Sequence, residues 1–185
     1  MLEDIPPKCI PIKIPRDDPF YSKFHIGCFG MRRAGILNTT GCSYPEKHQI
    51  HTGTHFMDMS SVYSNSVNGV NKLRKFVKGL LRAKILPRPH RRKDIYLPQV
   101  AKPTRSCFVG NDSAPCYESG DFRVNQNLGL VVFQTIFLRE HNRIAKELYE
   151  MHPEWSDETL FQEARRISIA QYLHITYNEF LPAVI

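Results

Sequence analysis

The stretch GDFRVNQNLGLVVFQTIFLREHNRIAKEL, residues 120–148, decides the fold class of this 185-residue chain. Within it, apolar side chains and one histidine recur every three or four residues, which is the spacing of one face of an α-helix: Leu130, Phe133, Phe137, His141, Ile144 and Leu148. We expect this helix to start near Gly120-Asp121. It should stop at His152-Pro153, because proline has no backbone N–H to continue the helix.

A second helix is predicted directly after the first. Ser156 is a suitable N-cap, and Asp157 and Glu158 place negative charge at the positive end of the helix. Its predicted inner face continues toward Tyr177, with Pro182 beyond its end, and consists of Leu160, Ala164, Ile167, Ala170 and His174. Two such helices with a short linker form an αα-hairpin.

The rest of the chain has weaker patterns. Residues 11–19, PIKIPRDDP, predict extended chain, because each proline disfavours helix at the residue before it. Residues 70–100 contain short apolar stretches broken by prolines, and short helices and a hairpin both remain open there. The expected fold is mainly α, with long irregular proline-rich segments and little β.

Composition excludes several classes of protein. Hydrophobic residues make up 42% and charged residues 23%, which is typical of a globular domain and not of a disordered chain. No stretch reaches 18 consecutive apolar residues, so no membrane-spanning helix is expected. Residues 1–8 lack the basic start and apolar run of a secretory signal.

The net charge of +7 comes from one segment. Ten of the 25 Lys and Arg residues lie in residues 72–93, which contain no Asp or Glu. Such a segment could contact a polyanion or be a solvated face. Because Phe76 is its only Phe, Tyr or Trp and no nucleic-acid-binding motif accompanies it, specific nucleic-acid recognition is not expected.

Cysteines and glycosylation motifs indicate an oxidising compartment. Cys107 and Cys116 flank the sequon Asn111-Asp112-Ser113, and a second sequon begins at Asn38. A disulfide-closed, glycosylated loop belongs in a secreted protein, which conflicts with the missing signal. The conflict disappears if the chain is a piece of a longer secreted protein.

Two patterns around residue 54 suggest metal ligands. His48, His51 and His55 would share a face of a helix and could bind zinc, but residues 52–54 are poor helix formers, so three polar histidines on a loop are favoured. Oxygen-bearing groups alternate at Thr54, the carbonyl of Phe56, Asp58 and Ser60. They could bind Ca²⁺, although the pattern alone favours a strand with Phe56 packed.

Arg123 stands just before the long helix, among polar residues. It could face solvent, or Asp121 or Asn125 could hold it inward. A buried arginine is rare unless it is paired or functional, and the local sequence leaves the alternatives open.

Taken together, separated motifs resemble the animal haem peroxidases. They are residues 9–19 (CIPIKIPRDDP), 54–63 (THFMDMSSVY), 120–130 with 138–145 (LREHNRIA), and 161–166 with 175–182. The resemblance implies a single, incomplete haem peroxidase domain over residues 1–185, without the segments that carry the distal and proximal histidines. It also implies that His141 is a helix residue and not an iron ligand.

The resemblance assigns roles to site residues. Thr54, Phe56 through its carbonyl, Asp58 and Ser60 become calcium ligands, and Arg123 becomes the distal arginine that contacts haem and peroxide. Gln126 stands where the family usually has a glutamate that forms an ester with haem. An amide cannot form that ester, but it can donate a hydrogen bond. Cys107–Cys116 matches a local family disulfide, Cys9 and Cys28 resemble cysteines with partners upstream, and Cys42 has no assigned partner.

The implied function is haem-dependent reduction of hydrogen peroxide coupled to oxidation of a donor, in response to oxidative stress, by a secreted protein. We expect the chain alone to be inactive, because neither iron-flanking histidine is present. The alternative is a non-catalytic, peroxidase-like module that binds polyanions through residues 72–93.

Overall fold

The computed structural model describes residues 9–32, 48–86, 94–100, 107 and 116–185. The chain divides into two compact units, residues 1–52 and 53–185. Each unit is described by itself. Asn38, Cys42 and Asn111 lie outside the described residues.

The first unit is a small β-hairpin. Strand β1 (Cys9–Lys13) pairs antiparallel with β2 (Cys28–Arg32), so that Ile12 lies opposite Phe29. The connection contains the 3₁₀ helix η1 (Tyr21–Phe24). The Asp18 carboxylate accepts hydrogen bonds from the backbone N–H of Phe20 at 2.9 Å and of Tyr21 at 2.7 Å, which stabilises this turn. Of the extended chain predicted over residues 11–19, residues 11–13 belong to β1, and residues 16, 17 and 19 lie in turns.

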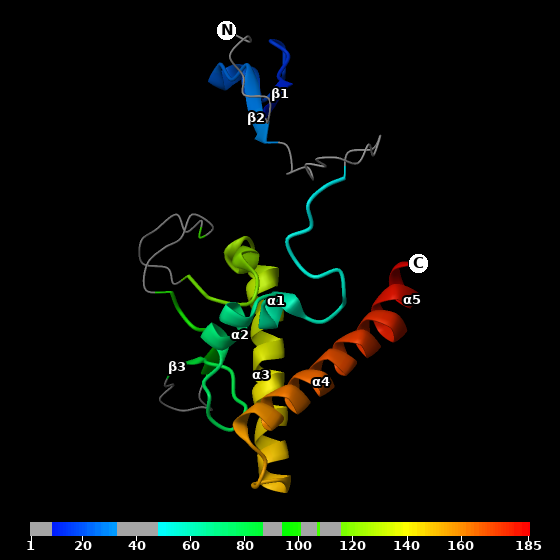
Figure 1. Ribbon diagram of the computed structural model, residues 1–185. Helices are drawn as coiled ribbons and strands as arrows, with labels where there is room; N and C mark the ends of the chain where they lie inside the picture. Colours follow the sequence, from blue (N-terminus) through cyan, green and yellow to red (C-terminus); the bar gives the residue numbers. More distant parts are fainter. Residues whose placement is uncertain (1–8, 33–47, 87–93, 101–106, 108–115) are drawn as a thin grey trace, which may run out of the picture. The chain divides into compact units, whose positions relative to one another are not determined.

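The second unit is built on α3 (Leu128–Met151) and α4 (Asp157–Ile175), which pack against each other as the predicted helix pair (Figure 1). Helix α3 buries Phe137, His141, Ile144 and Leu148, and Phe133 in its second turn is exposed. It starts later than predicted, because Asn127 caps it by accepting a hydrogen bond from the Leu130 N–H at 3.0 Å. Residues before it form the 3₁₀ helix η2 (Phe122–Asn125).

Helix α4 has the predicted cap but a different inner face. The Ser156 side chain accepts a hydrogen bond from the Thr159 N–H at 3.1 Å. The buried residues are Leu160, Phe161, Ala164 and Ser168, whereas Ile167, Ala170 and His174 are exposed. The predicted face was therefore wrong beyond Ala164.

The chain stays helical beyond α4. It continues through a π-helical turn, η3 (Thr176–Phe180), into α5 (Leu181–Val184), seen as the red end in Figure 1. Pro182 lies in the first turn of α5, directly after the π-helical turn.

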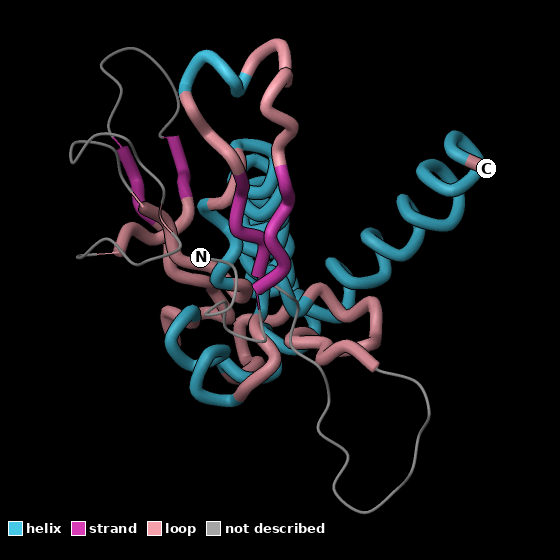
Figure 2. The backbone as a smooth tube through the Cα atoms, turned by 90° about the horizontal axis from the view of Figure 1, so that it is seen from above, coloured by secondary structure: helices cyan, strands magenta, loops and turns pink. Residues whose placement is uncertain are grey.

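Of the two structures left open for residues 70–100, the hairpin is found at the apolar stretches: β3 (Lys84–Leu86) pairs antiparallel with β4 (Asp94–Tyr96). Two short helices, α1 (Ser60–Tyr63) and α2 (Val67–Leu73), come before it, and only the end of α2 falls within that range. Strands are short and few beside the helices in Figure 2, as expected for a mainly α fold. Within the described residues, no helix is long and apolar enough to span a membrane.

Candidate functional site

The residues predicted as calcium ligands lie together in a loop, which we call the oxygen loop (residues 54–60). Thr54 Oγ1 lies 2.7 Å from Asp58 Oδ1, 3.2 Å from the Phe56 carbonyl oxygen and 3.4 Å from Ser60 Oγ. The Ser60 N–H donates to Asp58 Oδ1 at 3.0 Å. The loop therefore gathers four oxygen atoms, that of the Thr54 hydroxyl and three around it.

The alternative of a strand with Phe56 packed is wrong. Residues 53 and 55–58 form bends, and the Phe56 side chain is 68% exposed. Met59 has a left-handed backbone, with φ 55°, and its buried side chain anchors the turn into α1. The donor set is one carboxylate, two hydroxyls and a carbonyl, which are hard oxygen ligands that suit Ca²⁺. Because Ca²⁺ takes 6–8 oxygens, this set requires additional ligands.

Arg123, in η2, is held by Asp121. The Asp121 carboxylate accepts hydrogen bonds from Arg123 Nε at 2.9 Å and Nη2 at 2.6 Å, a two-pronged pairing. These bonds lower the pKa of Asp121 and raise the pKa of Arg123. Asn125 does not hold Arg123; its side chain instead bonds the backbone N–H and carbonyl of Tyr117.

The Arg123 guanidinium lies on an open face of the unit. Its side chain is 50% exposed, and the neighbouring side chains of Phe122, Gln126 and Leu128 are exposed as well. A cation, an amide and apolar groups on one short stretch suit a large, mostly apolar ligand that also carries polar groups, such as haem. The residues present therefore fit one wall of such a site.

His141, the histidine closest to Arg123 in sequence, cannot bind iron here. It is fully buried, with Nδ1 2.9 Å from the Tyr63 hydroxyl and Nε2 2.9 Å from the Gly79 carbonyl oxygen. Both ring nitrogens are therefore engaged. The alternative of a zinc site at His48, His51 and His55 gains no support. In the described part of the chain, no three His, Cys, Asp or Glu side chains gather as metal ligands.

The predicted local disulfide is confirmed. Cys107 and Cys116 are bonded, with their Cα atoms 6.0 Å apart. Cys116 is buried, and the next residue, Tyr117, forms a β-bridge with Gln99. The disulfide is thus fixed at one end to the packed part of the unit. Cys28 carries an exposed, free thiol.

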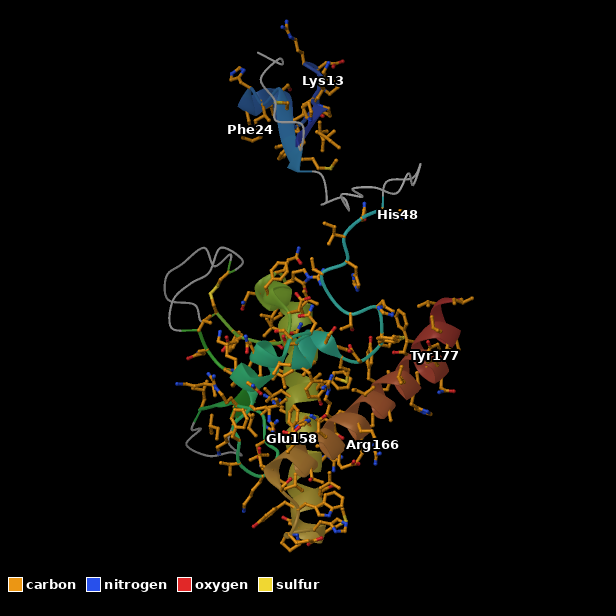
Figure 3. The ribbon with its side chains drawn as sticks, viewed as in Figure 1. Lys13, Phe24, His48, Glu158, Arg166 and Tyr177 are labelled. Carbon is orange, nitrogen blue, oxygen red and sulfur yellow. A yellow bond between two sulfur atoms is a disulfide. The ribbon has the colours of Figure 1, made fainter. Side chains whose placement is uncertain are left out.

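Two cations of the basic segment, Lys72 and Arg74, form ion pairs within the fold, which the sequence pattern did not reveal. Arg74 is 6% exposed and pairs with Asp157, at 2.8 Å, and with Glu158. Glu158 lies at the start of α4 and is labelled in Figure 3. Its guanidinium also lies 4.2 Å from the centre of the Phe161 ring. Lys72 pairs with Glu118.

Other cations gather around a cavity of about 410 Å³. Its charged lining residues are Lys75, Arg82 and Lys84 from the basic segment and Lys146 from α3; among the described residues, no Asp or Glu lines it. Asn142 fixes one wall, because its side chain accepts from the Leu81 N–H at 2.8 Å and donates to the Leu81 carbonyl at 3.1 Å.

Comparison with known proteins places the chain in a family. The animal haem peroxidase family model matches residues 2–185. The chain is 40% identical to chorion peroxidase of Aedes aegypti over 177 residues, 96% of the chain and 21% of that relative. It is 37% identical to lactoperoxidase of Mesocricetus auratus over 182 residues, 96% of the chain and 25% of that relative. The chain thus spans about a fifth to a quarter of these relatives.

Solved structures agree with the family match. Peroxidase A from Dictyostelium discoideum has a TM-score of 0.77 and 27% identity, covering 96% of this chain and 36% of that protein. A fatty acid alpha-dioxygenase from Oryza sativa shares the fold, with a TM-score of 0.58 and 23% identity. That match covers 89% of this chain and 23% of the dioxygenase chain. The chain belongs to the animal haem peroxidase family.

Proposed function

We propose that the chain is part of a haem-dependent peroxidase that reduces hydrogen peroxide and oxidises donor molecules. The main support is Arg123, held by Asp121 on an exposed face in the motif that matches the family. The chain covers only part of its relatives' length. We therefore propose that residues 1–185 belong to one incomplete peroxidase domain, with the iron-flanking histidines on polypeptide outside them. Family membership does not favour a purely non-catalytic module.

Haem would supply the iron that exchanges electrons with peroxide and donor. Arg123 would stabilise the negative charge that develops on peroxide oxygen as the O–O bond breaks, because its guanidinium stays protonated. Asp121 engages two of its five N–H groups. The remaining three can donate to a ligand. Gln126 would donate a hydrogen bond to haem in place of an ester link.

In the oxygen loop, Thr54, the Phe56 carbonyl, Asp58 and Ser60 would bind calcium. This calcium proposal is supported by the distances from Thr54 Oγ1 to the oxygens of Phe56, Asp58 and Ser60, which are all within 3.4 Å. The ion would replace the hydrogen bonds within the loop with stronger contacts to each oxygen. It would thereby fix the turn that leads into α1.

We further propose an extracellular location, with glycans on Asn38 and Asn111 and a role in the response to oxidative stress. The Cys107–Cys116 disulfide supports this location, because disulfides persist in oxidising compartments. The name of one relative, chorion peroxidase, agrees with it.

A second proposed property, alongside catalysis, is polyanion contact at the cavity lined by Lys75, Arg82, Lys84 and Lys146. Its lining among the described residues has no aromatic side chain on which a base could stack. That favours a sulfated polysaccharide over a nucleic acid. Lys75→Ala/Lys84→Ala should elute from immobilised heparin at lower salt, whereas Arg166→Ala, on the exposed side of α4 (Figure 3), should not. Equal elution of all three proteins would remove this property.

The catalytic proposal is tested by haem content and peroxide-dependent dye oxidation. We expect the complete gene product to show a Soret band and turnover. The chain of 185 residues, expressed alone with haem, should show neither a stoichiometric low-spin haem spectrum nor turnover. A complete gene product without haem would contradict the proposal.

A further inference from the structure

The oxygen loop and the chain before Arg123 are joined through α1. Ser60, the last residue of the oxygen loop, is also the first residue of α1. The carbonyl of the next residue, Ser61, accepts two hydrogen bonds, from the Asp121 N–H at 3.0 Å and from the Ser119 hydroxyl at 3.1 Å. Residues 119–121 are thus bonded directly to the first turn of α1.

Between these two hydrogen bonds, Gly120 brings the two backbones into contact. A Cβ atom at Gly120 would lie 2.8 Å from the Tyr63 nitrogen, and closer still to the Ser60 carbonyl oxygen and the Ser64 nitrogen. No side chain lies between the two segments at this point. Because close-packed backbones leave no slack, a shift of α1 must be transmitted to residues 119–121.

The next contact is from Asp121 to Arg123. Asp121 Oδ1 accepts from the Arg123 backbone N–H at 2.8 Å and from Nε at 2.9 Å, and Oδ2 accepts from Nη2 at 2.6 Å. The carboxylate therefore caps η2 and also fixes the rotation of the guanidinium. The Asp121 side chain is only 17% exposed, whereas the Arg123 side chain is 50% exposed, so the carboxylate is the fixed partner of the two.

In the oxygen loop, Asp58 has a role like that of Asp121, because its carboxylate also accepts a hydrogen bond from the backbone N–H two residues later. Its Oδ1 accepts from the Ser60 N–H at 3.0 Å and lies 2.7 Å from Thr54 Oγ1. A cation bound by these oxygens would draw on the same carboxylate that holds the first residue of α1. A change at the oxygen loop thus reaches α1 by a hydrogen bond.

We infer that Asp121 is a positioning residue for Arg123, and that Ser119, Gly120 and Asp121 couple the guanidinium to the oxygen loop through α1. Cation binding in the loop and the orientation of Arg123 then depend on each other. The inference rests on the proposed roles of Arg123 and of the oxygen loop. Its contacts all lie within the second unit and need no haem.

NMR of arginine side chains in the chain of 185 residues tests the coupling. Calcium should shift the Arg123 Nε–H signal. Arg143 is a matched internal control, because it is also 50% exposed and its Nε donates to Glu140 at 2.8 Å on α3. Its signal should not move.

Asp121→Asn should speed solvent exchange of the Arg123 Nε–H roughly tenfold, as for loss of a charge-assisted hydrogen bond. It should also abolish the calcium-induced shift while calorimetry shows calcium still bound. Ser119→Ala, a milder change that keeps the Gly120 contact, should reduce the shift. Unchanged exchange in Asp121→Asn would overturn the positioning role.

Thr54→Ala separates the coupling from the calcium proposal, because it perturbs the loop without any ion. If calcium does not bind but Thr54→Ala shifts the Arg123 signal, the coupling stands and the calcium site fails. If calcium binds and leaves Arg123 unmoved, the coupling is wrong and the calcium site stands. If neither calcium nor Thr54→Ala moves the signal, the coupling is also wrong.

Discussion

The Tyr63 hydroxyl donates a hydrogen bond to Nδ1 of His141 across 2.9 Å in the core of the second unit. The direction follows from the other ring nitrogen: Nε2 faces the Gly79 carbonyl oxygen at 2.9 Å, which can only accept, so Nε2 carries the proton. This neutral imidazole joins α1, α3 and the loop at residue 79. It is therefore a structural histidine.

Acid should destabilise the second unit through His141. Burial lowers the pKa of His141 from 6.5 to about 4; the Gly79 hydrogen bond opposes this shift, and the charges of Arg165 and Arg74 add to it. In the unfolded chain the imidazole takes up a proton below about pH 6.5, whereas in the folded chain it stays neutral until about pH 4. Stability is therefore lost as pH falls through this window, by about 2 kcal/mol between pH 6.5 and 5.

Urea unfolding at pH 7, 6 and 5 measures this loss. His141→Gln keeps a donor and an acceptor in the core but cannot titrate. This variant should have a lower free energy of unfolding at pH 7. Between pH 7 and 5, its free energy of unfolding should change less with pH than that of the wild type. If the stability of His141→Gln fell with pH as steeply as that of the wild type, groups other than His141 would cause the loss.

Arg74, which follows α2, should contribute far more stability than an exposed arginine on α4. Arg74→Ala removes a 6% exposed cation from Asp157 and from the Phe161 ring. We expect a loss of about 3 kcal/mol in the free energy of unfolding, because the arginine packed on Phe161 is lost and the Asp157 carboxylate, 27% exposed, loses its partner. Arg166→Ala, 77% exposed and paired with Glu163, should cost about 0–1 kcal/mol. Similar losses in the two variants would contradict the assigned role of Arg74.

The sequence predicted the helix pair well, because its signals are local. The spacing of Phe137, His141, Ile144 and Leu148 places them on one face, and the Ser156 cap acts within its own turn. The inner face of α4 was misassigned beyond Ala164. There Ser168 is buried with its hydroxyl bonded to the Ala164 carbonyl at 2.9 Å, a compensation that a hydrophobic pattern does not record.

Tertiary contacts could not be read from the sequence. In the sequence, Arg74 is one of ten cations that could be solvated or bind a ligand. Its partner Asp157 lies 83 positions away, so a local pattern cannot predict the ion pair. Gly120 looked like a helix start, and its contact with α1 depends on residues near position 60. The site residues of the oxygen loop and Arg123 came only from the family resemblance, because their local patterns left alternatives open.

Calcium should stabilise the chain through Asp58. At a free concentration of 100 times Kd, a single site adds about 2.7 kcal/mol, which should appear as a higher Tm. Asp58→Ala should abolish the increase. Asp17→Ala, an exposed acidic position in the first unit, should retain it. A calcium-dependent Tm that is unchanged by Asp58→Ala would place the ion elsewhere.

Gln126→Glu should permit a covalent bond to haem in the complete gene product. A carboxylate can form an ester where an amide cannot, and Gln126 is exposed beside Arg123. Haem retained by protein after denaturing acid extraction, compared between wild type and variant, measures the link. Full extraction from the variant would argue against contact between residue 126 and the haem edge.

The role of Arg123 is tested most directly by the rate of peroxide reduction in the haem-loaded complete gene product. Arg123→Ala should slow this step roughly 10²–10³-fold at unchanged haem content, as for loss of one preorganised donor. Arg143→Ala, which removes an arginine of the same 50% exposure, should leave the rate unchanged. An Arg123→Ala protein that reduces peroxide as fast as wild type would contradict the assignment.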